Sequence, residues 1–504
     1  MAEVLLTHSY FLRFDRKQSK TNQPYPPLAT LYAASVLREG GIEVALFDSM
    51  LAQSENELID AIRMHSPKVV AIYDDSFNYL TKMCLGRMRI AAFRMIKIAK
   101  QAGCIVAVST SDSADHVAEY LDRGADFIIL GEGERTLLEL CDSILGRSNG
   151  SFDEIDGLSF QFDNEVVRTK PRRTVANLDE LPMPAWDLAD IQSYRKCWSS
   201  GYFSMNIVTT RGCPYGCNWC AKPVYGRVYN SRSPAKVVAE LSFLFRKFAP
   251  DHIWFCDDIF GLKGGWLEEF RREVDCAGLK FRYKCLSRPD LLLKDNSFDA
   301  LAASGCETVW IGAESGSQKI LDSMEKGTTV DQIRLATRQL KWRGIRVGYF
   351  LQFGFPGESF ADVNDTLKMV KQEMPDEIGI SVSYPLPSTK FHAMVKNRLG
   401  EKQNWFDSDD IALLFPGEFR PAFYRILHKV VHRLHRIRRI VSGSEKWKPR
   451  SIAALAYGML SLPVYLIGLQ LMRRRNPNRI SLGLQEPNSR SGGEPESIRA
   501  LKTS

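Results

Sequence analysis

Three cysteines lie close together in the sequence, at Cys213, Cys217 and Cys220. Three thiolates can bind three irons of a [4Fe–4S] cluster and leave the fourth iron open to a substrate. The glycines and the proline beside them allow the backbone to bend sharply, so that the three sulfurs can converge. The spacing therefore predicts a cluster-binding loop in which the three cysteines are both the metal ligands and the catalytic centre.

A structural zinc site is the alternative for such a loop. It usually has four protein ligands and combines a Cys-x2-Cys pair with a second pair of Cys or His. No second pair follows in this sequence, where Cys256, Cys276, Cys285 and Cys306 are scattered singly. The ligand count therefore favours the iron–sulfur cluster over zinc.

A tryptophan, Trp219, precedes the last cysteine of the loop. With this aromatic residue, the Cys-x3-Cys-x2-Cys spacing resembles the signature of the radical S-adenosylmethionine (SAM) superfamily. The resemblance implies that a reduced cluster binds SAM and cleaves it, and that the 5′-deoxyadenosyl radical formed takes hydrogen from an unactivated carbon. It also implies an electron donor such as flavodoxin or ferredoxin.

Strand-like and helical patterns alternate from the cysteine loop onward. The apolar run at 205–210 precedes the loop, and further strand-like runs follow at 252–256, 281–285, 308–311, 347–353 and 378–384. Ser233 with Pro234, and Thr329 with Gln332 in a capping box, indicate the starts of two helices between them. Repeated βα units predict a parallel sheet, and these six resemble the partial (β/α)6 TIM-like barrel of the superfamily.

Polar side chains follow several of these strands, at the end where β/α barrels have their active sites. By the resemblance, Asp257 and Asp258 would approach the methionine amino group of SAM, Arg288 its carboxylate and Glu314 its ribose. Each of these residue types is also common in ordinary turns and ion pairs. The residues predicted to bind SAM are Trp219, Asp257, Asp258, Arg288, Glu314, Ser315, Gln352 and Phe353, the last two on the adenine side.

The first 150 residues contain a second alternation of short apolar runs and helical stretches. The strand-like runs lie at 4–6, 44–47, 69–73, 105–108 and 127–130. They predict a doubly wound, Rossmann-like α/β sheet that is buried on both faces. In residues 26–34 and 131–136, and in 178–186 of the linker that follows, the chain resembles the cobalamin (B12)-binding domain that precedes the barrel in B12-dependent radical SAM enzymes.

Two features depart from the usual cobalamin-binding sequence. The chain has no Asp-x-His-x-x-Gly motif to supply an axial histidine to cobalt, and the run 109–112, Ser-Thr-Ser-Asp, stands where Gly-Gly-Pro-His is usual. Glycines at such a turn allow a cofactor to approach the backbone. Bound cobalamin and a retained fold without cobalamin therefore both stay open. If cobalamin binds, we expect its nucleotide tail near Ser76, Ser109, Thr110 and Ser111.

Cysteine usage and charge limit the class of protein. Eight of the eleven cysteines are dispersed, so they form no disulfide framework, and the first residues lack a secretion signal. Both observations predict a reducing, cytoplasmic location. The net charge is +8, but residues 420–475 alone carry +12 and the rest of the chain −4. We therefore expect no nucleic-acid binding by the catalytic body.

The C-terminal region has features of a membrane-facing segment. Apolar residues at helical spacing between 423 and 441 alternate with Arg425, Lys429, Arg433 and Arg436, the pattern of a basic amphipathic helix. An uncharged run at 451–472 follows, interrupted by Pro463. About 20 apolar residues can span a bilayer. We expect an interfacial or re-entrant anchor, with a spanning helix and a hairpin packed on the barrel as alternatives.

These patterns together predict six segments and an activity. The segments are a cobalamin-binding-like Rossmann domain at 1–150, a linker at 151–200, the radical SAM barrel at 201–395, a helical extension at 396–445, an apolar membrane-associating segment at 446–475 and a disordered tail at 476–504. The predicted activity is functionalisation of an unactivated carbon in a hydrophobic, lipid-like substrate, by cobalamin-dependent methyl transfer. The alternatives are oxidative cyclisation without methyl transfer and an iron–sulfur redox or scaffold module.

Overall fold

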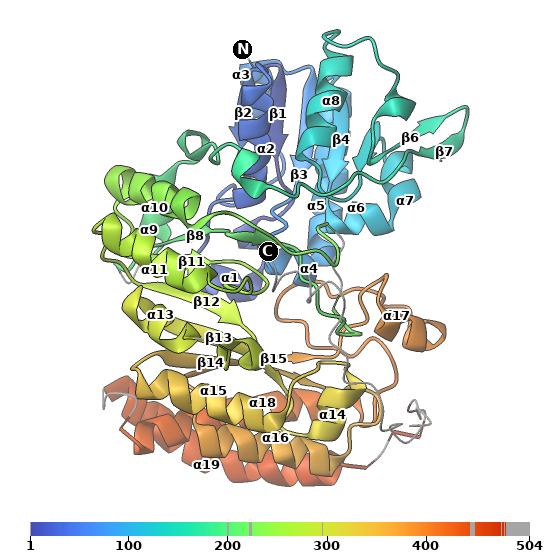
Figure 1. The fold of residues 1–504 in the computed structure, drawn as a ribbon. Coiled ribbons are helices and arrows are strands. Elements are labelled where there is room, and N and C mark those ends of the chain that lie inside the picture. The colour runs from blue at the N-terminus through green and yellow to red at the C-terminus, as the bar shows by residue number, and fades with distance from the viewer. Residues whose placement is uncertain are drawn as a thin grey trace, which may run out of the picture. The chain divides into compact units, whose positions relative to one another are not determined.

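Figure 1 shows the protein in a computed structural model, which describes residues 2–198, 201–220, 224–294, 296–443, 449–474, 476, 477 and 479. The chain divides into two compact units. Unit 1 comprises residues 1–214, 222–258 and 404–410, and unit 2 comprises residues 215–221, 259–403 and 411–504. The division passes through the cysteine loop, so Cys213 belongs to unit 1, whereas Cys217 and Cys220 belong to unit 2.

A seven-stranded sheet forms the centre of unit 1, in the order β2-β1-β3-β4-β5-β6-β7. Its parallel strands are β1 (Val4–Thr7), β2 (Val44–Phe47), β3 (Val69–Tyr73), β4 (Ile105–Ser109) and β5 (Phe127–Ile129). Successive side chains of β3 pack on opposite faces of the sheet. Val70 and Ile72 belong to one cluster of buried side chains, and Val69 and Ala71 belong to another. Burial on both faces is typical of a doubly wound sheet. The prediction of this fold is confirmed.

Helices cover both faces of this sheet (Figure 1). One buried cluster receives side chains from α3 (Glu57–His65), α5 (Leu85–Gln101) and α7 (Val117–Asp122), and the other from α2 (Leu28–Glu39) and α8 (Glu134–Ile144). Shorter helices are α1 (Arg16–Thr21), α4 (Leu80–Met83), α6 (Ser111–Asp115) and α9 (Ile191–Cys197).

An antiparallel hairpin extends the sheet into the segment predicted as a linker. It consists of β6 (Leu158–Phe162) and β7 (Glu165–Arg168), and β6 pairs with β5. The rings of Phe152 and Phe160 pack against Phe127 of β5, with centroids 4.8 and 5.9 Å away. Aromatic burial at the sheet edge thus orders part of the segment that the sequence presents as a connection.

The second sheet has six strands in the order β15-β14-β13-β12-β11-β8. The strands are β8 (Ser204–Ile207), β11 (His252–Phe255), β12 (Tyr283–Ser287), β13 (Cys306–Glu314), β14 (Arg346–Phe353) and β15 (Glu377–Val382). β8 pairs with β11, and β12 to β15 pair in succession, all in parallel. This parallel sheet is the predicted partial TIM-like barrel. The expectation is confirmed.

Helices connect these strands. They are α10 (Pro234–Phe248), α11 (Trp266–Cys276), α12 (Pro289–Leu292), α13 (Ser297–Ala303), α14 (Gln318–Ser323), α15 (Val330–Trp342), α16 (Phe360–Glu373) and α17 (Lys390–Val395). The Ser233 side chain caps α10, and Thr329 forms a capping box with Gln332 at α15. Both predicted helix starts are confirmed, because these hydroxyls accept otherwise unpaired backbone N–H groups.

Two long helices follow in unit 2, α18 (Pro421–Val441) and α19 (Pro449–Met472). The apolar side chains of α18 do not form a membrane-facing stripe: Phe423, Leu427 and Val430 are buried, and the helix packs against α16, β15 and α19. The same helical periodicity arises when a helix covers a protein core. Among the described residues, α19 alone is long and apolar enough to cross a membrane, by length and composition. Of residues 476–504, predicted as a disordered tail, the structure describes only 476, 477 and 479.

Candidate active site

A short hairpin in unit 1 leads into the cysteine loop. β9 (Thr210–Arg211) pairs in antiparallel fashion with β10 (Asn230–Ser231), which lies beyond the loop. Gly212 has φ +81°, and a Cβ there would lie 2.2 Å from the Val228 carbonyl oxygen. Only glycine fits this position. The predicted sharp bend before the first cysteine is therefore built into the hairpin.

Asp257 fixes the start of this loop. Its carboxylate, at the end of β11, accepts hydrogen bonds from the backbone N–H groups of Thr209 and Thr210 at 2.7 Å and from both hydroxyls at 2.8 and 3.0 Å. Burial raises the pKa of Asp257 to about 6. Its neighbour Asp258, also predicted to bind SAM, is exposed. Asp257 thus orders the backbone that leads to the cysteines.

Arg211 ties the loop to a second sequence motif of unit 1. Its buried guanidinium forms ion pairs with Glu132 and Glu134, the latter at 2.8 Å, and both carboxylates are buried. The rings of Tyr32, Phe77 and Tyr225 surround the cation, with centroids 5.3, 5.7 and 5.1 Å away. The Gly-Glu-Gly-Glu run of the N-terminal domain therefore holds the residue that lies two positions before Cys213.

In unit 2, Cys217 lies beside a cation. Its sulfur is 3.8 Å from Nη1 of Arg288, which is buried and stacks on the Tyr215 ring at 3.6 Å. The same guanidinium pairs with Asp290 at 3.0 Å and donates to the Lys326 carbonyl at 2.8 Å. A nearby cation stabilises the thiolate, the form in which cysteine binds a metal. Arg288 lies where the sequence predicts it, at the end of β12.

Glu314 ends β13 in a strained conformation. Its φ is +56°, and the pairing of β13 with β14 shifts register between Gly312 and Glu314. A non-glycine residue adopts this left-handed region at an energetic cost, and such residues are common in functional sites. The side chain is buried and pairs with Nζ of Lys326 at 2.9 Å. Burial alone would lower the pKa of Lys326, but the Glu314 carboxylate raises it above its usual value.

Within unit 2, Lys326 lies between Glu314, a candidate SAM residue, and Trp219 of the cysteine loop. Its ammonium lies 5.8 Å from the centre of the Trp219 ring, next to Cys220 in sequence. Lys326 does not stand out in the sequence, because a single lysine belongs to no motif. Its burial beside Glu314 is what marks it, and burial of a lysine is rare unless it is paired.

The remaining predicted SAM residues lie in the same region of unit 2. Gln352 and Phe353 end β14, next to β13 in the sheet, and both are buried. The Gln352 amide donates to the Ser383 hydroxyl at 3.0 Å. Ser315 is 3.1 Å from the hydroxyl of Thr366 on α16. The carboxyl ends of adjacent strands thus carry these side chains, as the sequence predicts.

The four residues predicted to meet the cobalamin tail line one small cavity in unit 1. Ser76, Ser109, Thr110 and Ser111 surround it together with Asp74, and its volume is about 20 Å³. The Thr110 side chain caps α6. Hydroxyl groups and a carboxylate suit the polar tail of a cofactor, but a cavity of this size holds about one water molecule. A nucleotide tail would have to widen it.

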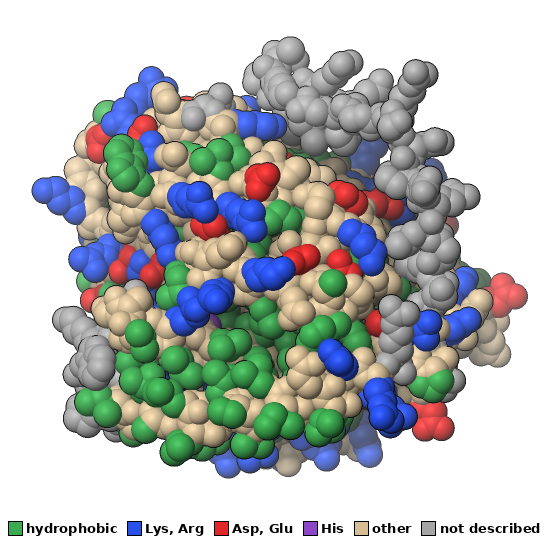
Figure 2. Space-filling model, turned by 90° about the horizontal axis from the view of Figure 1, so that it is seen from below, with side chains coloured by type: hydrophobic (Ala, Val, Ile, Leu, Met, Phe, Trp, Pro, Cys, Tyr) green, Lys and Arg blue, Asp and Glu red, His purple; other side chains and the backbone are tan. Residues whose placement is uncertain are grey.

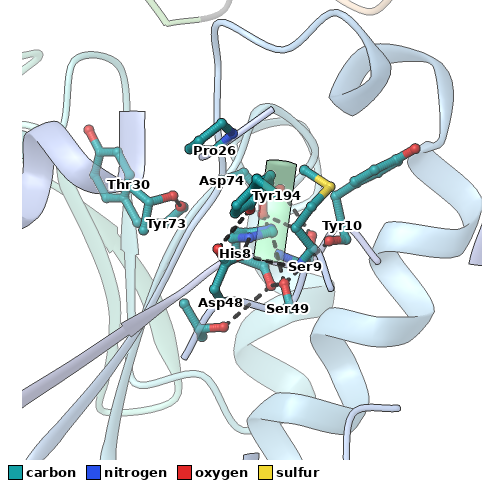
Figure 3. A network of polar contacts seen from close by, with 12 residues as sticks. His8, Ser9, Tyr10, Pro26, Thr30, Asp48, Ser49, Tyr73, Asp74 and Tyr194 are labelled. Atoms are coloured by element: carbon teal, nitrogen blue, oxygen red, sulfur yellow. Dashed lines mark hydrogen bonds and ion pairs between the residues drawn. The ribbon is translucent and has the colours of Figure 1, made fainter. Parts of the chain in front are cut away.

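A buried polar network lies at the carboxyl ends of β1, β2 and β3 (Figure 3). His8 Nε2 is 3.0 Å from Asp48, which accepts from the Tyr194 hydroxyl at 2.7 Å. Ser9 donates from its N–H and hydroxyl to Asp74, at 2.7 and 2.9 Å. Burial raises the pKa of Asp74 to about 6. The network fixes one wall of the cavity, and no sequence motif indicates it.

Comparison with known proteins identifies the part of the chain that carries the cysteines. The sequence model of the Radical SAM superfamily matches residues 207–370. These residues match a radical SAM domain. Among the described residues, no three His, Cys, Asp or Glu side chains form a group that could hold a metal ion. The assignment of the three cysteines to the cluster therefore rests on the motif of this domain.

Relatives extend beyond this domain. An uncharacterised methyltransferase of Pyrococcus horikoshii is 28% identical over 75% of this chain and 81% of its own length. The anaerobic magnesium-protoporphyrin IX monomethyl ester cyclase of Rubrivivax gelatinosus is 25% identical over 78% of this chain and 69% of its own length. The structure of the cobalamin-dependent SAM radical enzyme OxsB with aqua-cobalamin and SAM bound is similar, with a TM-score of 0.70 and 18% identity, and the match covers 93% of this chain and 72% of that one. The radical SAM fold with a preceding doubly wound domain is confirmed.

Proposed function

We propose that this protein is a cobalamin-dependent radical SAM methyltransferase that acts on a hydrophobic substrate. The observation that carries the proposal is the strained, buried Glu314 at the end of β13, paired with Lys326 beside Trp219 of the cysteine loop. A carboxylate held at a barrel strand end can accept hydrogen bonds from a ribose. The fold shared with OxsB and the similarity to a methyltransferase support the rest of the proposal.

Each group of side chains has a distinct part in this proposal. Cys213, Cys217 and Cys220 would hold the [4Fe–4S] cluster, which when bound supplies the electron that cleaves SAM. Arg288 lies beside the Cys217 sulfur and Lys326 over the Trp219 ring, and both cations would attract the carboxylate end of SAM. Ser76 and the hydroxyls of 109–111 would contact the nucleotide tail of cobalamin. The remaining proposed SAM contacts are Asp258, Ser315, Gln352 and Phe353, with Asp257 ordering the loop.

Replacing Glu314 by glutamine tests the SAM site. A hydrogen bond to a charged group contributes about 1.5–3 kcal/mol, so SAM affinity should fall about 10- to 150-fold. Iron content should not change, because Glu314 is not one of the residues proposed to bind the cluster. Calorimetric titration of the reconstituted protein with SAM measures the effect. Glu307→Gln, at the opposite end of β13, is the control and should bind SAM normally. Unchanged affinity in Glu314→Gln would refute the ribose role.

Cobalamin binding has its own test. Protein reconstituted with hydroxocobalamin should retain the corrin through gel filtration. Ser111→Trp fills the cavity at α6 and should lower retention at least about tenfold, because a bulky ring clashes with the tail. Ser148→Trp, in an exposed loop, should retain cobalamin like the unmodified protein. If the unmodified protein retains none, methyl transfer is abandoned and the protein is a radical SAM enzyme without cobalamin.

Product analysis separates the candidate reactions. Reduced protein given SAM with a labelled methyl group should form 5′-deoxyadenosine and place label in an apolar product such as a polyprenoid or a tetrapyrrole. Oxidative cyclisation, which the similarity to the cyclase favours, would form 5′-deoxyadenosine without transferring label. An iron–sulfur redox or scaffold module would form neither. The proposal includes a flavodoxin or ferredoxin as electron donor, and a cytoplasmic location at a membrane surface.

A further inference from the structure

The two sides of α19 have different surroundings. On one side the helix packs along α18: a Cβ at Gly458 would lie 3.1 Å from Ile437, and Leu469 is buried. On the other side, large apolar side chains are exposed at positions that share one helix face. These are Ile452, Met459, Leu460, Val464, Ile467 and Leu471, with exposed fractions of 48, 60, 79, 68, 62 and 72%. Scattered exposed apolar residues are ordinary, but a continuous row along a helix indicates a contact surface.

Basic side chains lie along one edge of this apolar row. Arg433 of α18 stacks on Tyr465 of α19 at 4.2 Å and donates from Nε to the Ser461 hydroxyl at 3.0 Å. Lys429 lies over the same tyrosine ring at 5.6 Å. These contacts hold two cations beside the exposed face of α19.

A groove with further cations lies along the other edge. α16, α18 and α19 enclose about 490 Å³, a volume typical of small-molecule sites. Val370, Leu434 and Leu466 provide apolar walls, while Lys371 and Arg438 bring positive charge. Lys368 also lines the groove but pairs with Asp365 at 2.9 Å. Figure 2 shows the band of hydrophobic side chains at this end of unit 2 and the Lys and Arg side chains on either side of it.

We propose that this face of unit 2 docks on an anionic phospholipid bilayer, with α19 lying in the plane of the interface and a lipid headgroup bound at the groove. A helix that lies in an interface has apolar residues on one face and basic residues along its length. A helix that crosses the bilayer has its cations near its ends instead. Arg433 contacts Tyr457, Ser461 and Tyr465, in the middle of α19 rather than at its ends, so the geometry favours the interfacial orientation.

The charge of this region also indicates which partner covers the exposed face of α19. Lys429 and Arg433 lie along one edge of the face and Lys371 and Arg438 along the other, so two copies of the face brought together would repel each other. An anionic membrane complements the same charge, because each basic residue near its surface is attracted to the anionic headgroups. Burial of the apolar row in the bilayer removes its surface from water and supplies the remaining attraction. A bilayer therefore complements both the apolar row and the positive charge of the face, whereas a second copy of the chain complements only the apolar row.

Vesicle co-sedimentation of the full chain tests the apolar row. The protein should bind vesicles of phosphatidylcholine with phosphatidylglycerol more tightly than vesicles of phosphatidylcholine alone. Leu460→Glu with Val464→Glu should weaken binding at least about 100-fold, since burying each side chain contributes roughly 1.5–3 kcal/mol. Both residues are exposed, so folding should not change. Met64→Glu with Trp342→Glu alters two equally exposed apolar residues elsewhere and should bind like the unmodified chain.

The groove is tested by removing its charge. Lys371→Gln with Arg438→Gln should weaken binding to anionic vesicles about 30-fold, which is about fivefold per charge. Arg63→Gln with Lys20→Gln, on other helices, should have little effect. Equal binding to neutral and anionic vesicles would overturn the proposal. So would a dimer in sedimentation that Leu460→Glu dissociates, without vesicle binding. No cofactor or substrate is needed, so these results stand apart from the proposed chemistry.

Discussion

Replacement of Cys217 by alanine should abolish cluster binding and all SAM cleavage. Three thiolates are the minimum that the loop provides for a [4Fe–4S] cluster with one open iron, so loss of one leaves two irons without protein ligands. Cys217 is buried beside Arg288, and alanine cannot replace its sulfur. The protein reconstituted under anaerobic conditions should carry about four irons, and the variant almost none. Iron and sulfide analysis, together with 5′-deoxyadenosine formation, measures both losses.

A cysteine outside the loop provides the control for this experiment. Cys276 ends α11 and is exposed, and Cys276→Ala should retain the full iron content and activity. Full iron in a variant that lacks all three loop cysteines would contradict the assignment. Stoichiometric zinc in place of iron in the unmodified protein would instead favour the structural zinc alternative.

The sequence predicts those parts of the molecule that depend on short-range patterns. Buried-strand runs place β1 to β5 and the six barrel strands, because apolar residues and breakers alternate over a few positions. The caps of α10 and α15 follow from single side chains next to the helix start. The ends of β12, β13 and β14 are predicted as polar, and Arg288, Glu314 and Gln352 lie there.

Pairing between distant side chains is not visible in the sequence. Lys326 meets Glu314 only after α14 has turned the chain back, and the strained φ of Glu314 depends on the register shift between β13 and β14. The network around His8 likewise gathers residues from three strand ends and α9. A lysine or histidine in isolation is compatible with many environments, so tertiary contacts decide its role.

Periodicity identifies an apolar face but not what covers that face. The apolar residues of α18 have the spacing of an amphipathic helix, and the structure shows that the core of unit 2 and α19 cover them. The exposed apolar row lies instead on α19, whose apolar residues are less regularly spaced in the sequence. In the same way, the sequence of β6 and β7 does not show that Phe160 packs on Phe127. Long-range burial overrides local composition in each case.

Replacement of Arg211 by methionine should destabilise unit 1 by about 3–5 kcal/mol, the usual cost of breaking a buried ion pair by removing one partner. The change leaves Glu132 and Glu134 buried without their cation and removes the contacts with three aromatic rings. Folded domains are stable by only about 5–15 kcal/mol, so the loss is a large fraction of the total. Urea unfolding followed by circular dichroism should show that the variant has its unfolding midpoint at a clearly lower urea concentration than the unmodified protein.

The pH dependence of this variant distinguishes a lost ion pair from lost packing. Burial already raises the pKa of Glu132, and Arg211 opposes that rise. Without the cation, the folded-state pKa of the carboxyl lies further above its unfolded value, so the folded variant binds more protons than the unfolded chain. Its stability should therefore increase as the pH falls, and the deficit should be smaller at about pH 5.5 than at about pH 8. Arg135→Met, which breaks the exposed pair with Glu180, should cost less than about 1 kcal/mol. A deficit in Arg211→Met that is equal at both pH values would indicate that packing, rather than charge, holds the cysteine loop to the Gly-Glu-Gly-Glu run.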